Sequence, residues 1–231
     1  MENAVKIQID ERTLEVESGL SVLEAARMHG IVIPTLCYHE ALKPFAACRL
    51  CVVDIVTSRG PRLVAACTQP CEEGLVVDTR SARVLAARRT VVELIMAGGA
   101  HLPLVQAIGA SLGVTKPRFT LPPDDCVLCG LCVRACDELV GAHAISLAKR
   151  GLQKEYAPPF EITSAACIGC ATCVLICPTG AITLDDITPG PHTAHDARTC
   201  NVCGNQMLPR DFVDVEALFA EVVAAEEVEP A

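Results

Sequence analysis

The sequence lacks the residues and patterns that mark several common classes of protein. It contains no Trp, two Tyr and five Phe among 231 residues, so large aromatic side chains are scarce. Its 19 Lys and Arg stand against 28 Asp and Glu, and this acidic balance argues against a surface that binds nucleic acid. No Gly-rich dinucleotide fingerprint follows a predicted strand and no P-loop is present, so the chain carries neither nucleotide-binding motif.

Long apolar runs that enter or cross membranes are also missing. Residues 1–11 mix charged and apolar side chains and contain no stretch of signal-peptide type. The segment 94–115 has no charged residue apart from a protonated His101, but glycines and prolines interrupt it repeatedly. It is better interpreted as two short packed helices, or a helix and a loop, than as a membrane span. We therefore expect a cytoplasmic protein.

Cysteine, by contrast, is abundant. The chain has 15 cysteines and is too long to be a small disulfide scaffold. In the cytoplasm thiols stay reduced, so clustered cysteines indicate metal or redox chemistry. Their spacing assigns twelve cysteines to three groups of four, leaves a pair near the C-terminus, and leaves Cys71 as a single thiol.

Apolar periodicity and turn residues divide the chain into four pieces of an α+β protein. Ser21 and Glu24 form a capping box, which predicts that a helix follows, and Gly30 is placed to end that helix. Strands are predicted over 5–10, 14–16, 50–56 and 63–66. The predicted pieces are residues 1–79, a helical connector over 80–117, a repeat-bearing piece over 118–185, and a C-terminal piece over 186–231 that ends in an amphipathic helix.

The strongest motif is C-x2-C-x2-C-x3-C, which occurs twice at an interval of 41 residues. In two-cluster ferredoxins the first three cysteines of one motif bind one [4Fe–4S] cluster, and the fourth binds the other cluster. The expected first set is Cys126, Cys129, Cys132 and Cys177, and the expected second set is Cys136, Cys167, Cys170 and Cys173. Two zinc sites are the alternative, but zinc ribbons use separated C-x2-C pairs.

Each motif is followed by a similar short apolar segment, at residues 144–147 and 181–184. Two copies of a helix-and-strand unit therefore predict a pseudo-symmetric domain. One detail departs from the usual pattern, because Cys177 is followed by Pro178 whereas Cys136 is followed by Asp137.

An N-terminal quartet of cysteines is spaced C-x10-C-x2-C-x15-C and consists of Cys37, Cys48, Cys51 and Cys67. Three thiolates on one long loop with a distant fourth fit a [2Fe–2S] cluster, although the first gap is ten residues rather than the four of plant-type ferredoxins. Cys71 competes with Cys67 as the fourth ligand, and we favour Cys67 because it ends a strand-like run. A zinc site is the alternative for the quartet.

In this order, the motifs resemble the N-terminal iron–sulfur region of the complex I large subunit (NADH:quinone oxidoreductase). They resemble still more the free-standing iron–sulfur gamma subunit of NAD-linked hydrogenase diaphorase modules. The matching stretches are 33–40, 47–53, 64–67 and 126–143, within a similarity that covers about residues 3–185. The resemblance implies a β-grasp [2Fe–2S] domain, a helical connector and a two-cluster ferredoxin-like domain. It also implies a partner subunit that binds flavin and NAD(P)H.

The sequence departs from this family between the two cluster-binding regions. The family usually carries an H-x3-C-x2-C-x5-C run there, which holds a further [4Fe–4S] cluster, but no cysteine lies between Cys71 and Cys126. His101 stands near the place of the family's histidine, without the cysteines. We therefore expect three clusters rather than four, with His101 an ordinary packed histidine or a relic of the lost site.

A second metal-like pattern lies outside the resemblance, near the C-terminus. It has the form H-x2-H-x4-C-x2-C and consists of His192, His195, Cys200 and Cys203. Two His and two Cys can complete a tetrahedral zinc site. A further Fe–S cluster shared with a partner chain, or thiols that bind no metal, are the alternatives.

The sequence thus predicts an electron-transfer subunit that is not catalytic on its own. It would relay single electrons between the flavin and NAD(P)H partner and a catalytic subunit, such as a hydrogenase, a formate dehydrogenase or another reductase, including electron-bifurcating systems. A free-standing polyferredoxin is the first alternative. A redox- or metal-sensing regulator is the second, although no DNA-binding element is visible.

Overall fold

A computed structural model of the chain describes residues 4–158, 164, 166–183, 198–199 and 206–207. The chain forms two compact units, one of residues 1–131 with 178–181 and the other of residues 132–177 with 182–231. No helix among the described residues is both long and apolar enough to span a bilayer. The predicted C-terminal helix lies outside the described residues.

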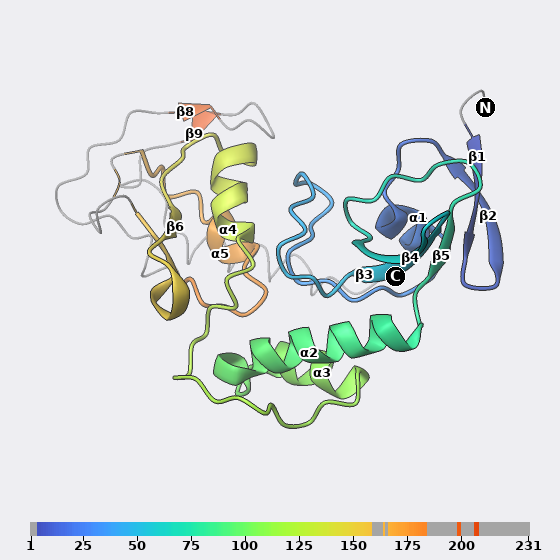
Figure 1. Cartoon of the computed structure of the whole chain (residues 1–231). Helices are drawn as coiled ribbons and strands as arrows, with labels where there is room; N and C mark the ends of the chain where they lie inside the picture. Colours follow the sequence, from blue (N-terminus) through green and yellow to red (C-terminus); the bar gives the residue numbers. More distant parts are fainter. Residues whose placement is uncertain (1–3, 159–163, 165, 184–197, 200–205, 208–231) are drawn as a thin grey trace, which may run out of the picture. The chain divides into compact units, whose positions relative to one another are not determined.

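The first unit is built on a five-stranded mixed sheet with the strand order β2-β1-β5-β3-β4 (Figure 1). Only the central pair, β1 and β5, is parallel. The strands are β1 Ala4–Ile9, β2 Arg12–Glu17, β3 Val52–Thr57, β4 Gly60–Ala65 and β5 Val76–Asp78. Alternate residues of β1 and β2, including Ile7, Ile9 and Leu14, are buried in one core with the helix α1 (Val22–Met28). This is the α+β, β-grasp arrangement that the resemblance implied.

The first helix begins where the sequence predicted, at the capping box. The Ser21 hydroxyl accepts a hydrogen bond from the Glu24 backbone N–H at 3.2 Å, and the Glu24 carboxylate accepts one from the Ser21 N–H at 2.8 Å. Both bonds satisfy backbone donors that would otherwise have no partner within the helix. The helix ends at His29, and Gly30 follows in the left-handed conformation with φ +71°.

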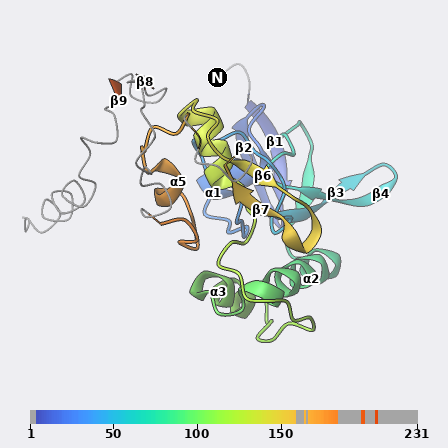
Figure 2. The same ribbon diagram turned by 90° about the vertical axis from the view of Figure 1, so that its left-hand side faces the viewer.

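The connector is a pair of packed helices, α2 (Ala82–Gly99) and α3 (Pro103–Ser111), which lie side by side in Figures 1 and 2. The prediction that 94–115 breaks into short helices is therefore correct. The two helices bury a second apolar core, here called the connector core. It consists of Leu36, Leu50, Val92, Met96, Leu102, Val105, Leu112 and Val114.

Two members of the connector core, Leu36 and Leu50, come from the loops that carry the N-terminal cysteines rather than from the helices. They directly precede Cys37 and Cys51. The helices therefore support the cysteine-bearing loops in addition to linking residues 1–79 to the later part of the chain.

The second unit has less regular structure. A helical segment consists of α4 (Leu131–Arg134), which starts at the last residue of the first unit, and a π-helical turn, η1 (Ala135–Leu139). A small hairpin then pairs β6 (Ser146–Ala148) with β7 (Glu155–Ala157) across a 3₁₀ turn, η2 (Gly151–Gln153). The helix α5 (Thr172–Leu175) lies in the second motif, and β8 (Arg198–Thr199) pairs with β9 (Gln206–Met207).

The predicted repeat of a helix-and-strand unit is only partly correct. Both motifs contain a short helix, but residues 181–183 form no strand, and residue 184 lies outside the described residues. In the first copy, β6 gains its hydrogen-bonding partner from β7, an adjacent hairpin strand. Similar sequences therefore differ here because a strand requires a partner and the sequence pattern alone does not supply one.

Replacing Ser21 with Ala should lower the free energy of unfolding by about 1 kcal/mol, because the Glu24 N–H loses its capping acceptor. Urea denaturation of the anaerobically purified chain, followed by far-UV circular dichroism, measures this change. The exposed Ser18→Ala is the matched control and should change stability by less than about 0.5 kcal/mol. Equal midpoints for the two variants would contradict the capping role.

Replacing Gly109 with Ala should destabilise the chain by about 1–3 kcal/mol through overpacking, although Ala is the better helix former. A Cβ at this position would lie 2.7 Å from the Val114 carbonyl oxygen and 2.9 Å from the Met96 sulfur. The same denaturation assay applies. The exposed Ala110→Gly in the same helix tests helix propensity alone and should cost only about 1 kcal/mol. A stabilised Gly109→Ala variant would show that the helices separate freely.

Candidate metal centres

The pairing of two strands brings Cys51 and Cys67 together. Cys51 directly precedes β3, and one residue, Ala66, separates the end of β4 from Cys67. These two strands form an antiparallel pair. The two sulfur atoms lie 3.5 Å apart, and both residues are only 1% exposed. The Ala66 N–H donates to the Cys51 carbonyl at 3.1 Å and continues the strand pairing to the cysteines themselves.

The other two cysteines of the N-terminal quartet form a second pair. The Cys48 N–H donates to the Cys37 sulfur at 3.4 Å, and the two side chains are also hydrogen-bonded to each other. Cys37 is 1% exposed, whereas Cys48 is half-buried. The quartet therefore consists of two contacting pairs of thiols.

In each pair the pKa of one thiol is lowered and that of the other is raised. The hydrogen bond from the Cys37 side chain lowers the pKa of Cys48 to about 5, and the same bond raises the pKa of Cys37. In the other pair, the hydrogen bond between the two side chains lowers the pKa of Cys51 to about 7, and the same bond, followed by burial, raises the pKa of Cys67. One thiolate per pair thus forms readily, as a thiolate ligand requires.

The backbone around Cys48 is strained. Ala46 and Arg49 adopt left-handed conformations with φ +55° and +58°, which cost non-glycine residues of the order of 1 kcal/mol each. Such turns direct consecutive N–H groups toward one side of the loop, where they can meet an anionic sulfur. The N–H of Cys48 does so, toward Cys37.

The loop that carries Cys37 is also tied to the helix α1. The Tyr38 hydroxyl donates to the Glu24 carboxylate at 3.2 Å, and the guanidinium of Arg27 lies 4.6 Å from the centre of the Tyr38 ring. Arg27 also donates to the Thr35 hydroxyl at 3.1 Å. These contacts join positions 8 to 14 residues apart, and no regular sequence period predicts them.

Cys71, the other candidate for the fourth ligand, is placed elsewhere in the core. Its N–H donates to the Leu20 carbonyl at 2.7 Å, and its side chain packs in the sheet core. Burial, followed by the nearby Glu24 carboxylate, raises the pKa of Cys71 to about 11. Cys67 is favoured as the ligand by its position, because its sulfur contacts the Cys51 sulfur at 3.5 Å.

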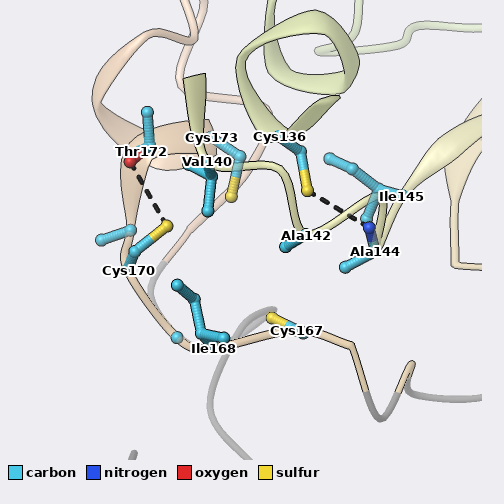
Figure 3. Close-up of a pocket in the computed structure, with 12 residues that line it drawn as sticks. Cys136, Val140, Ala142, Ala144, Ile145, Cys167, Ile168, Cys170, Thr172 and Cys173 are labelled. Carbon is cyan, nitrogen blue, oxygen red and sulfur yellow. Dashed lines mark hydrogen bonds between the residues drawn. The ribbon is translucent and has the colours of Figure 1, made fainter. Parts of the chain in front are cut away.

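The second predicted set of [4Fe–4S] ligands lines a single cavity in the second unit. Figure 3 shows the four sulfur atoms around this space, with Val140, Ala142 and Ile168 forming apolar parts of its wall. The ligand set is Cys136, Cys167, Cys170 and Cys173. Cys136 of the first motif therefore meets three cysteines of the second motif that lie 31 or more residues later, as the crossed ferredoxin pattern requires.

Hydrogen-bond donors and neighbouring charges act on these sulfurs. The Ala144 N–H donates to the Cys136 sulfur and the Thr172 hydroxyl to the Cys170 sulfur, each at 3.3 Å. Burial, followed by the charges of Cys170 and Cys167, raises the pKa of Cys173 to about 12. A positive iron core would reverse this effect and favour the thiolates.

The cysteines of the first predicted [4Fe–4S] set belong to different units. Cys126 and Cys129 lie in the first unit, whereas Cys132 and Cys177 lie in the second. This set remains a prediction. The Cys126 sulfur accepts a hydrogen bond from the Leu128 N–H at 3.4 Å.

The two C-x2-C-x2-C loops nevertheless share one backbone conformation. Leu128 and Gly130, on either side of Cys129, have φ +53° and +73°. The equivalent residues of the second motif, Gly169 and Ala171, have φ +69° and +56°. Left-handed residues thus occur at the same two positions in both loops, although the amino acids differ.

The sequence also singled out His101 and the C-terminal H-x2-H-x4-C-x2-C pattern, and the described residues include only the first. His101 lies between α2 and α3, and its Nε2 is 2.7 Å from the carboxylate of Asp125. It is therefore an exposed histidine in contact with a carboxylate, and the expectation of a packed histidine is wrong. His192, His195, Cys200 and Cys203 lie outside the described residues. Within the described ranges, no group of three or more His, Cys, Asp or Glu is arranged to hold a single metal ion.

Family models match two parts of the chain. Residues 2–82 match the 2Fe-2S iron-sulfur cluster binding domain, and residues 160–183 match the 4Fe-4S binding domain. The chain therefore contains a [2Fe–2S] cluster-binding domain and a [4Fe–4S] binding motif, as the cysteine spacing predicted.

Two curated relatives are subunits of larger oxidoreductases. An NADH-quinone oxidoreductase subunit of Rhizobium meliloti is 34% identical over 206 residues, which cover 77% of this chain and 24% of the relative. An NADP-reducing hydrogenase subunit of Solidesulfovibrio fructosivorans, HndD, is 33% identical over 208 residues, which cover 76% of this chain and 35% of the relative. The chain thus spans about a quarter to a third of the length of these relatives.

A solved structure resembles most of the chain. The crystal structure of NAD+-reducing [NiFe]-hydrogenase in the H2-reduced state matches with a TM-score of 0.58 and 28% identity, and the match covers 87% of each chain. Together with the curated relatives, this similarity confirms the family resemblance and the fold class predicted from the cysteine motifs.

Replacing Cys67 with Ala should abolish the [2Fe–2S] cluster, whereas replacing Cys71 with Ala should leave it in place. The reason is that Cys67 contacts Cys51, whereas Cys71 packs beside Glu24. Visible absorption and electron paramagnetic resonance of the reduced chain, with iron analysis, measure the difference, which is about two irons per chain. Retention of the cluster in Cys67→Ala together with its loss in Cys71→Ala would reverse the assignment.

Proposed function

Because this chain is related to iron–sulfur subunits of NADH-quinone oxidoreductases and NAD(P)-linked hydrogenases, we propose that it is an electron-transfer subunit of such a complex. It relays single electrons between a subunit that binds flavin and NAD(P)H and a catalytic subunit. Its own residues bind the clusters and hold them at fixed positions, and the substrate chemistry belongs to the partners.

The N-terminal quartet fits a [2Fe–2S] cluster, in which each of two irons takes two protein ligands. The two contacting pairs of thiols suggest how the ligands divide. Cys37 and Cys48 would bind one iron, and Cys51 and Cys67 the other. When bound, the cluster supplies a one-electron redox centre. The side chains supply thiolates, and the Cys48 N–H supplies a hydrogen bond to sulfur.

Two [4Fe–4S] clusters complete the proposal. The second set fits one of them because its four cysteines line one cavity. The shared left-handed geometry of the two loops supports the other, since a backbone conformation that is costly for Leu128 and Ala171 occurs in both. With these sites, the proposed cluster-binding regions are residues 1–79 and 118–185, joined by 80–117.

The observation that carries the relay is the composition of the connector core. Cys48 of the quartet and Val127 of the first C-x2-C-x2-C motif both pack against this core. The [2Fe–2S] site and the start of the [4Fe–4S] region are therefore in contact with the same apolar group of side chains. Within the first unit, packed side chains therefore lead from the N-terminal quartet to the start of the first C-x2-C-x2-C motif.

The charge of the loaded chain favours docking onto basic partner surfaces. The sequence has a net charge of −9 with its cysteines counted as neutral. A cluster with four thiolates adds about −2 when oxidised, so three clusters bring the chain to about −15. Such a charge attracts a complementary positive surface over a range set by the ionic strength.

The proposal extends to the C-terminal pattern and to the cellular location. His192, His195, Cys200 and Cys203 are proposed to bind zinc because two His and two Cys match its usual ligands. A cytoplasmic location is proposed because clustered reduced thiols suit a reducing compartment.

Anaerobically purified chain should contain about ten irons and ten acid-labile sulfides, the sum for one [2Fe–2S] and two [4Fe–4S] clusters. Cys173→Ala and Cys132→Ala should each remove about four irons, whereas the matched control Cys71→Ala should remove none. A wild-type content of about two irons would contradict the proposal of three clusters.

The relay itself is tested with the native complex. Tagged chain isolated from its source cells should bring with it a flavin-containing subunit, and NADH or NADPH should reduce its clusters only when that subunit is present. Reduction of the isolated chain by NAD(P)H at the same rate would contradict the assigned division of labour. Isolation without any partner would favour the free polyferredoxin.

A further inference from the structure

Arg88 of the helix α2 is a buried cation that the relay described above does not use. It is 4% exposed and lies on the helix face that also buries Val84 and Val92, at intervals of four residues. Placing a guanidinium among apolar side chains costs free energy unless charge and hydrogen bonds compensate it. An Arg within an apolar stripe was a signal visible in the sequence.

The hydrogen bonds of Arg88 lead to the [2Fe–2S] site. Its Nε and Nη2 both donate to the carbonyl oxygen of Val52, at 3.1 and 2.8 Å. Val52 is the residue directly after Cys51 and the first residue of β3. The side chain thus holds the backbone at the point where the strand continues into the ligand loop.

A neutral carbonyl does not compensate the charge of the guanidinium. Among the described residues, no carboxylate forms an ion pair with Arg88. Burial lowers the pKa of Arg88, and a Cys51 thiolate, followed by the Asp10 carboxylate, opposes this effect. Asp10 is already engaged, because its two oxygens accept hydrogen bonds from the Thr79 N–H at 2.7 Å and from the Thr79 hydroxyl at 2.8 Å.

We propose that Arg88 is a positioning residue for Cys51 and the buried counter-charge of the [2Fe–2S] cluster, and that it raises the reduction potential of this cluster. The inference rests on the proposed function, because it requires the cluster in the quartet. One electron from the flavin partner takes the cluster and its four thiolates from a net charge of about −2 to about −3. A fixed positive charge stabilises the more negative state more strongly.

The position of Arg88 also explains why the connector belongs to the cluster site. Its side chain extends from α2 and binds the first residue of β3, the strand that directly follows Cys51. On the opposite side of the same residue pair, the Ala66 N–H binds the Cys51 carbonyl at 3.1 Å. Consecutive carbonyls, those of Cys51 and Val52, are therefore both fixed.

The test is a redox titration of the full-length chain, monitored by electron paramagnetic resonance of the [2Fe–2S] signal. Arg88→Met keeps an apolar stem without the charge, Arg88→Lys keeps the charge without the two-pronged bond, and Arg80→Met removes an exposed charge just before the same helix. We expect Arg88→Met to weaken reduction at least tenfold, which lowers the midpoint by about 59 mV for one electron.

Arg88→Lys should keep its midpoint closer to wild type than to Arg88→Met, with an altered signal shape because Cys51 is held less firmly. Arg80→Met should match the wild type in both respects. An Arg88→Met chain that retains its [2Fe–2S] signal at an unchanged potential would overturn the inference and leave the proposed function intact.

If Arg88→Met fails to bind the cluster, Arg88→Lys decides the matter. If the Lys variant binds the cluster with a midpoint near that of the wild type, the result supports the counter-charge. If its midpoint falls by about 59 mV or more, which corresponds to reduction weakened tenfold, the result overturns the counter-charge. A wild-type chain without any [2Fe–2S] signal is a different result, because it overturns the proposed function itself.

Discussion

The burial of acidic sulfur is the constraint on which the rest of this structure depends. Thiolates that lie side by side in an apolar interior repel one another, and burial alone raises the pKa of a thiol. Both effects act on Cys173. The fold answers with backbone N–H donors, as at Cys37 and Cys136, and with the guanidinium of Arg88 beside Cys51. A bound iron core would supply the remaining positive charge.

Strained backbone is the second answer to the same constraint. Four residues of the ligand loops adopt left-handed conformations without being glycine, and they are Ala46, Arg49, Leu128 and Ala171. A conformation of this kind persists only where the surrounding structure imposes it, and it clusters at functional sites. For Ala46 and Arg49, the sheet core and the connector core impose it, because residues of the N-terminal ligand loops pack in both.

Sequence reasoning succeeded where the information is local. The capping box at Ser21 and the alternating strands β1 and β2 are set by neighbouring residues, and the cysteine intervals state which thiols belong to a motif. It failed where a distant partner decides the outcome. The three-residue strand β5 was missed because its pairing with β1 and β3, rather than its own pattern, makes it a strand. The division of the quartet into two pairs likewise depends on the pairing of β3 with β4.

The connector contains no cysteine between Cys71 and Cys126. In the family that this sequence resembles, the corresponding region usually holds a further cluster between the two cluster-binding regions. Here its histidine position, His101, is exposed and paired with Asp125. The connector core nevertheless contacts both Cys48 and Val127, so the two proposed sites border one group of apolar side chains. The close approach of Gly109 to Val114 and Met96 holds the two connector helices together and so keeps this group of side chains in place.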